Sequence, residues 1–208
     1  MPSDKLVYSG VIEALFQRAL ENRLTPACRG LLREAGLDLD KKLAPTYSLE
    51  QWRKFLRIAA DHVYAGVPAE AGYYELGERF VEGYFSSLFG RALVGMVRLA
   101  GPRRALVQAP LGFRTSTSFS EVRIVERESS GLELWVNDVV ADQPTFLAGV
   151  LARTVELAGG QRVVVVPEGF DGQAATFHIR WSEQAEAVAD LSPGATAGGR
   201  VSAPRPPA

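Results

Sequence analysis

The sequence predicts an α+β fold in which a helical N-terminal half packs against a small four-stranded antiparallel sheet in the C-terminal half. Helices are expected first because apolar residues of the N-terminal half recur three and four positions apart. After Pro110 the apolar residues alternate with polar ones, which is typical of strands. A single helical segment separates two pairs of such strands and gives the order ββαββ.

Three helices are expected at the N-terminus, from apolar spacing and from residues that begin or end helices. The first covers about residues 7–22. Thr25 caps the second, which begins at the following proline and ends at Gly36, where a left-handed turn suits glycine. The third begins after Ser48, because Ser48 and Gln51 have the spacing of a capping box.

Two more helices are expected over residues 69–84 and 85–99, within the segment AGYYELGERFVEGYFSSLFGRALVGMVRLAG. Each glycine costs a helix about 1 kcal/mol relative to alanine, so something uses the space that the glycines leave. Close packing of helices is the favoured explanation. The alternative is a slot for a ligand.

The four strands are expected in two pairs. SEVRIVERE and LELWVND form the first pair, joined by a turn at residues 129–131, and RVVVVP and AATFHIRW form the second. The helix between the pairs begins at Pro144 and ends at Gly159. The segment FRTSTSF, residues 113–119, is expected to be the entrance to the first strand.

The length of 208 residues suits one domain followed by a tail. Residues 1–181 are expected to form a single α+β ligand-binding-like domain. Residues 182–208 lose the large apolar side chains and gain proline, glycine, alanine and serine. Such a segment cannot bury enough apolar surface to become ordered, so a disordered tail is expected there.

Charge and cysteine content argue against several classes of protein. There are 23 basic and 24 acidic residues, a balance that argues against a nucleic-acid partner. The single cysteine, Cys28, excludes an intrachain disulfide, and no export signal is visible, so a cytoplasmic location is expected. The most apolar stretch, residues 80–99, contains Glu82, Arg91 and Arg98 and therefore predicts no membrane span.

Few residues are suited to catalysis or metal binding. His62 lies at the expected end of the third helix, and His178 alternates with the apolar residues of the last strand, so it faces the wetter side of the sheet. Neither histidine has the spacing of a metal-binding motif. The serines lack a GxSxG motif, and the carboxylates are spread over solvated helix faces. We therefore expect no metal, no cofactor and no enzymatic activity.

A ligand site is expected where aromatic residues and arginines gather. The candidate residues are Tyr73, Phe80, Tyr84 and Phe89, which would line an apolar cavity, and Arg103, Arg104 and Arg114, which would contact an acidic group at its rim. The alternative is that the aromatic residues form ordinary core and that nearby glutamates offset the arginines at the surface. The sequence alone leaves both interpretations open.

Three blocks of the sequence, EAGLDLDK, LGERFVEGYFSSLFGRAL and GPRRAL, resemble a large paralogous family of unknown function best represented in myxobacteria, over about residues 6–181. More remotely, LELWVND, the helix FLAGVLARTVELAGG and the strand ATFHIRW resemble a ligand-binding superfamily. It comprises haem-nitric-oxide-binding, 4-vinyl-reductase and Golgi vesicle-tethering (TRAPP) subunit domains. That resemblance implies a helical layer over a small antiparallel sheet, often with an apolar ligand held by the helices.

Two departures from the haem sensors argue against haem. The stretch GRALVGMVRLAGPRRAL corresponds to the helix that carries their proximal histidine, but it contains no histidine. FRTSTSFSEVR has serine and arginine but lacks the tyrosine and the spacing of their Tyr-x-Ser-x-Arg clamp on the haem propionates. The resemblance therefore implies the fold without the haem.

Together, these features predict a non-enzymatic, cytoplasmic regulatory domain that binds a small apolar or amphipathic ligand, with or without an acidic group, or a protein partner. The alternative is a dimerising scaffold for protein assembly, similar to vesicle-tethering subunits. A closed internal cavity would favour the ligand, whereas an exposed apolar patch would favour a homodimer or a larger complex.

Overall fold

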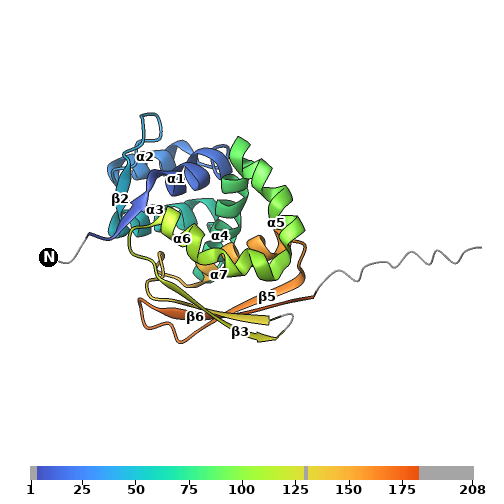
Figure 1. The fold of residues 1–208 in the computed structure, drawn as a ribbon. Coiled ribbons are helices and arrows are strands. Elements are labelled where there is room, and N and C mark those ends of the chain that lie inside the picture. The colour runs from blue at the N-terminus through green and yellow to red at the C-terminus, as the bar shows by residue number, and fades with distance from the viewer. Residues whose placement is uncertain (1–3, 129–130, 183–208) are drawn as a thin grey trace, which may run out of the picture.

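A computed structural model gives the fold and describes residues 4–128 and 131–182, apart from the side chains of residues 88, 89 and 125–128. In Figure 1 the helices form a layer on one side of a four-stranded sheet. The predicted α+β class is therefore confirmed. The predicted tail, residues 182–208, lies outside the described residues except for Ser182, so the division into a domain and a tail stays a prediction.

The sheet has the predicted connectivity. Its strands are β3 (Val122–Glu128), β4 (Gly131–Val136), β5 (Gln161–Glu168) and β6 (Ala175–Ser182). They lie in the order β3-β4-β6-β5, and every neighbouring pair is antiparallel. Helix α7 (Thr145–Leu157) joins the first pair of strands to the second, as the order ββαββ requires.

One face of the sheet is buried and the other is open. Along β6, Phe177 and Ile179 point into the core and are buried, whereas His178 points to the outer face. The outer face carries polar contacts, including the Arg123 guanidinium 4.7 Å from the centre of the Trp135 ring. The alternation of apolar and polar residues thus predicted correctly which side of each strand meets the helices.

The N-terminus differs from the prediction. Residues 6–8 form strand β1 (Leu6–Tyr8), which pairs antiparallel with β2 (Thr46–Ser48). The helical part starts only with α1 (Ser9–Ile12) and continues as a π-helix, η1 (Glu13–Ala19). The expected helix start at residue 7 is therefore wrong. A strand of three residues is too short for its alternation to be distinguished from helical spacing.

The next two helices have the predicted caps. In α2 (Pro26–Glu34) the Thr25 hydroxyl accepts a hydrogen bond from the Cys28 amide at 3.2 Å. Gly36 follows with a φ of +100°, the left-handed conformation expected of it. In α3 (Leu49–Val63) Ser48 and Gln51 form the predicted capping box, with hydrogen bonds of 3.1 and 3.0 Å.

Three helices complete the helical layer: α4 (Ala69–Ser86), α5 (Leu88–Val107) and α6 (Ala109–Ser116). Helix α5 changes direction at Gly101, which has a φ of +78° and precedes a proline. Within the described part of the chain, every helix is too short or too polar to cross a bilayer.

Helix α6 was not expected, because FRTSTSF was interpreted as a strand entrance. The Thr115 and Ser116 hydroxyls instead donate hydrogen bonds to the Gly112 carbonyl of the same helix, at 2.9 and 2.8 Å. The hydroxyls thus find their hydrogen-bond acceptor within the helix, although threonine and serine have low helix propensity. The strand prediction for this segment is therefore corrected.

Aromatic side chains in the core pack the N-terminal helices against α7. The Trp52 ring of α3 packs edge-on against Phe16 of η1 at 6.1 Å and against Phe146 of α7 at 6.0 Å. Such edge-to-face pairs are favourable and leave little free volume. The space between the N-terminal helices and α7 is therefore filled by side chains at this level.

Candidate functional site

The predicted aromatic site residues lie in different environments. Tyr73 is 4% exposed and belongs to the core, whereas Tyr84 is 39% exposed. Phe80 is half-buried, with its ring 6.2 Å from that of Phe146 and 6.3 Å from that of Tyr84. Phe89 is in the first turn of α5, and its side chain is outside the part that the structure describes. Tyr73, Phe80 and Tyr84 follow α4 from the core to the surface.

Glycines bring the backbone of α4 into direct contact with two other helices. A Cβ atom on Gly77 would lie 2.0 Å from the Phe146 carbonyl oxygen of α7, and one on Gly149 of α7 would lie 2.1 Å from the Tyr74 carbonyl oxygen of α4. A Cβ on Gly83 would approach the backbone of η1 to 1.9 Å. The favoured explanation of these glycines, close helix packing, is thus confirmed, and no ligand fits between the helices at these points.

A polar cluster lies beside Tyr73. Arg57 of α3 forms an ion pair with Asp142 in the loop before α7, and Arg53 donates a hydrogen bond of 2.9 Å to the Val139 carbonyl in the same loop. Burial raises the pKa of Tyr73, and the negative charge of Asp142 raises it further. The cluster ties α3 to the loop, and its arginines already have partners.

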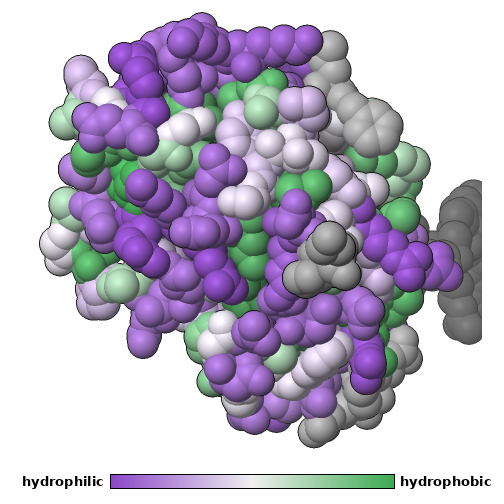
Figure 2. All heavy atoms as spheres, turned by 90° about the vertical axis from the view of Figure 1, so that its left-hand side faces the viewer, coloured by the Kyte–Doolittle hydropathy of each residue, from purple (hydrophilic) through white to green (hydrophobic). Residues whose placement is uncertain are grey.

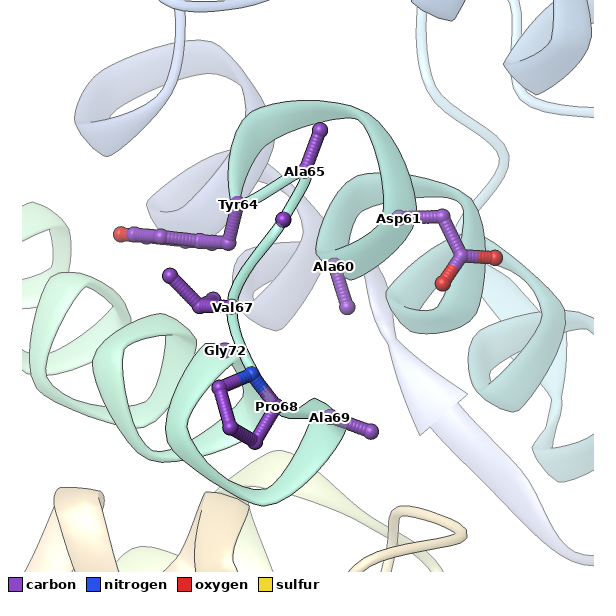
Figure 3. Close-up of a pocket in the computed structure, with 9 residues that line it drawn as sticks. Ala60, Asp61, Tyr64, Ala65, Val67, Pro68, Ala69 and Gly72 are labelled. Atoms are coloured by element: carbon purple, nitrogen blue, oxygen red, sulfur yellow. The ribbon is translucent and has the colours of Figure 1, made fainter.

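Two hollows on the described surface contain no predicted site residue. One, of about 160 Å³, lies between the end of α3 and the start of α4, where Figure 3 shows Asp61, Tyr64 and Pro68 around it. The other, of about 550 Å³, lies along α3 and is lined mostly by charged side chains such as Lys54 and Asp142. Pockets for small molecules typically have roughly 300–1,000 Å³ and a mainly apolar lining. Neither hollow combines that size with that lining.

An exposed apolar surface lies on the first segment of α5. Ala92, Gly95, Met96 and Leu99 are all exposed, and their spacing places them on one side of the helix. Leu99 is 91% exposed and Met96 is 57% exposed. A Cβ atom on Gly95 would have no atom within 4 Å, so this side of the helix is open. We call these four residues the α5 face.

Arginines border the α5 face and have no acidic counterparts on α5 or α6. Arg91 and Arg98 are exposed on one flank of the face, and in the part of the chain that the structure describes no carboxylate pairs with them. Between Glu82 and Glu121 the sequence contains five arginines and no acidic residue. Figure 2, which views the left-hand side of Figure 1, opposite α5, shows a mainly hydrophilic surface instead.

The predicted rim arginines continue this basic region. Arg104 and Arg114 are exposed, on the second segment of α5 and on α6, whereas Arg103 is half-buried. Val107 and Leu111, which lie near them in the chain, are also exposed. These arginines line neither of the two hollows, and their predicted contact with an acidic group stays a prediction.

Sequence reasoning did not single out Met96 and Leu99. They fell in an expected helix over residues 85–99 for which no burial or exposure of these two side chains was predicted. The missing signal was the distribution of charge: a segment of 38 residues without a single carboxylate stands out in a chain with nearly equal numbers of acidic and basic residues. Such a segment indicates a surface that meets negative charge elsewhere.

The histidines and the buried titratable groups lie apart from the α5 face. His62 is exposed in the last turn of α3, and His178 lies on the outer face of the sheet with its Nε2 3.1 Å from a Glu168 carboxylate oxygen. Burial raises the pKa of the Cys28 thiol in α2 and of Glu78 in α4. Among the described residues, no three histidine, cysteine or acidic side chains are grouped as ligands for a metal ion.

Solved structures with a similar fold are H-NOX proteins. The Fe(II) unliganded H-NOX protein from K. algicida has a TM-score of 0.61 at 14% identity, over 85% of this chain and 97% of that chain. For an H-NOX variant from S. oneidensis the TM-score is 0.66 at 8% identity, over 86% and 98%. For an oxygen-binding H-NOX domain related to soluble guanylate cyclases it is 0.55 at 10% identity, over 84% and 94%. The chain therefore has an H-NOX-like fold.

Comparison of the sequence with protein families identifies the family of the chain. The chain belongs to the family described as Protein of unknown function (DUF2378), whose model matches residues 5–182. The expected family of unknown function is thus confirmed, and the expected remote similarity is confirmed for the fold of the haem-nitric-oxide-binding domains. No curated protein matches the sequence.

The similarity to H-NOX proteins raises the question of haem, but the residues of this chain do not fit a haem group. The chain has two histidines, and both lie on outer surfaces, at the end of α3 and on the open face of the sheet. The backbone contact at Gly77 and the packing of Trp52 against Phe146 close the space between α4, α3 and α7. Among the described residues no histidine is therefore available in the interior as an iron ligand, and the packing leaves no room for a haem at these points.

Proposed function

We propose that this chain is a non-enzymatic regulatory domain that works without haem and binds an amphipathic partner through the α5 face. The observation that carries the proposal is the 91% exposure of Leu99 beside the unpaired Arg98. An exposed apolar surface with a charged border is typical of a binding site. The apolar residues bind the apolar part of the partner, and the arginines bind its acidic part.

An internal ligand has less support. The predicted residues Tyr73, Phe80 and Tyr84 lie on α4, whose glycines contact α7 and η1 directly. Tyr73 already packs in the core, and the hollow of about 550 Å³ that Arg57 and Asp142 line beside it has mostly charged walls. A surface site therefore explains the exposed residues of α5 better than a cavity.

The arrangement of titratable groups supports a domain without catalysis. Cys28 in α2 and Tyr73 beside Arg57 lie at separate places, and the neighbouring Tyr74 and Glu78 on α4, whose pKa values burial raises, line neither of the two hollows. An active site normally gathers such groups in one cleft. A cytoplasmic location belongs to the same proposal, because the only cysteine is a buried free thiol.

A second candidate is the dimerising scaffold, to which the predicted similarity to vesicle-tethering subunits points. The exposure of Leu99 and Met96 favours it, since apolar surfaces of this kind also join protein chains. In that case the α5 face would be buried against a second copy or another protein.

Binding of the amphipathic anion anilinonaphthalenesulfonate, followed by its fluorescence, tests the proposal. Saturable binding to the folded protein is expected, with a large loss in Leu99→Glu because the new carboxylate repels the sulfonate and removes apolar surface. Val67→Glu is the matched control, since Val67 is also exposed but lies at the turn between α3 and α4. Equal binding by Leu99→Glu and the wild type would contradict the proposal, and self-association lost in Leu99→Glu would favour the scaffold.

A further inference from the structure

We infer that the partner of the α5 face is an anionic lipid bilayer, on whose surface the domain lies without crossing it. The inference rests on the proposed function and specifies the chemistry of the partner. The first argument is the charge of the exposed residues on α5. Every fully exposed residue of α5 from Arg91 to Leu99 is either apolar or an arginine. This combination is typical of helices that lie in the interface of a membrane with anionic lipids.

The positions of the side chains on α5 match both the acyl-chain boundary and the phosphate layer of such an interface. Met96 and Leu99 project from the outer side of α5 and can enter the boundary between headgroups and acyl chains. Arg98 is on the flank, one position from Leu99 and two from Met96, and Arg91 is on the same flank about two turns before Arg98, so their guanidinium groups can remain at the depth of the phosphates. A guanidinium there forms paired, charge-assisted hydrogen bonds to phosphate oxygens.

The shape of the surface distinguishes a bilayer from a peptide. A partner helix normally lies in a groove between elements of the receptor. The two hollows described above lie along α3 and at its end, and α5 contributes no residue to either of them. The α5 face is instead the outer side of a single helix, at the edge of the molecule in Figure 1. A deformable lipid surface can cover such a helix side without a preformed groove.

Charge also disfavours a second copy of this chain. In a symmetric dimer through the α5 face, each residue of the face meets the equivalent region of the partner. Arg91 and Arg98 of both copies would then approach one another, and neither α5 nor α6 contains a carboxylate to separate them. An anionic bilayer provides the opposite charge that the helix itself lacks.

Sedimentation of the full chain with vesicles tests the inference. Vesicles of phosphatidylcholine with phosphatidylserine are expected to bind the protein, and vesicles of phosphatidylcholine alone are not. Binding is expected to weaken as salt is added and to weaken about fivefold for each arginine lost in Arg91→Gln and Arg98→Gln. Leu99→Glu is expected to abolish it, whereas Val67→Glu retains it.

Three results would overturn the inference. Equal binding to both kinds of vesicle would show that the arginines do not select anionic lipid. Equal loss in Leu99→Glu and Val67→Glu would move the contact away from the α5 face. If neither vesicle binds, while Leu99→Glu still abolishes binding of anilinonaphthalenesulfonate, the face is a binding surface with another partner. That last result would leave the proposed function standing and remove the bilayer, so the two failures are distinguishable.

Discussion

Helices α4 and α5 follow each other in the chain and share a composition rich in glycine and apolar residues, yet they meet opposite surroundings. On α4, Gly77 and Gly83 touch the backbones of neighbouring helices, and Leu76 is fully buried. On α5, Gly95 meets open space and Leu99 is exposed. The same kinds of residue thus hold the fold together in one helix and form a surface in the next.

The difference teaches how a functional surface can be recognised in a fold whose helices α4 and α7 pack closely. An apolar helix that packs on several sides stabilises the domain, whereas an apolar helix with an open side is costly to keep unless something covers it. The charges point the same way, because acidic residues accompany the single arginine of α4, Arg79, but are absent from α5. The contrast between the two helices can be tested directly.

The largest effect is expected where the backbones touch. Gly77→Val should abolish folding, because its Cβ would lie 2.0 Å from a carbonyl oxygen that cannot move away. Gly95→Val should change the free energy of unfolding by less than about 0.5 kcal/mol, since nothing lies near it. Circular dichroism with urea titration measures both. A folded Gly77→Val with near-normal stability would show that α4 is not packed as described.

A smaller effect is expected from removing apolar side chains. Leu76→Ala should lower the free energy of unfolding by about 2–5 kcal/mol, because it leaves a cavity in the core. Leu99→Ala should change it by less than about 0.5 kcal/mol, because the side chain is already in water. Urea denaturation of the two variants compares them, and a similar loss in both would mean that Leu99 is packed in the free protein.

The smallest effect on stability is expected from replacing Glu78, a carboxylate on α4. Burial raises the pKa of Glu78, and the charges of Glu75 and Glu156 raise it further. Since the folded pKa lies above the unfolded one, stability is lost as the pH rises through the pKa of Glu78. Glu78→Gln should therefore raise the melting temperature at neutral pH, with no gain at a pH low enough to protonate Glu78 in both states.

Replacing Asp171 is a control in which stability is expected to change in the opposite direction. Hydrogen bonds from the Gln173 and Ala174 amides lower the pKa of Asp171, so this carboxylate contributes stability that is lost as the pH falls. Asp171→Asn should lower the melting temperature at neutral pH and lose that effect in acid. Scanning calorimetry across pH measures both variants, and a loss of stability in Glu78→Gln at neutral pH would contradict the account.

Local signals predicted much of the fold. The capping box at Ser48, the left-handed Gly36 and the alternation along β6 each depend on a few neighbouring residues, so the sequence was sufficient. Strand β1 was missed because its three residues pair with a segment about forty positions away. Helix α6 was missed because threonine and serine have low helix propensity, so its last turn does not look helical in the sequence.

The candidate site was harder to predict, because burial of a helix depends on what packs against it. Tyr73 and Leu99 have similar apolar neighbours in the sequence, but one lies in the core and the other in solvent. The long interval without acidic residues, which includes α5, is a sequence feature that the predictions did not use. Charge distribution is therefore a better indicator of this surface than hydrophobicity.

The most direct test of the central claim is an environment-sensitive fluorophore attached at Leu99→Cys. The native Cys28 is buried and burial raises the pKa of its thiol, so labelling is restricted to the new cysteine. With vesicles containing phosphatidylserine, the account predicts a blue shift at position 99 and none for the same label at Val67→Cys. No shift at position 99, or equal shifts at both positions, would contradict it.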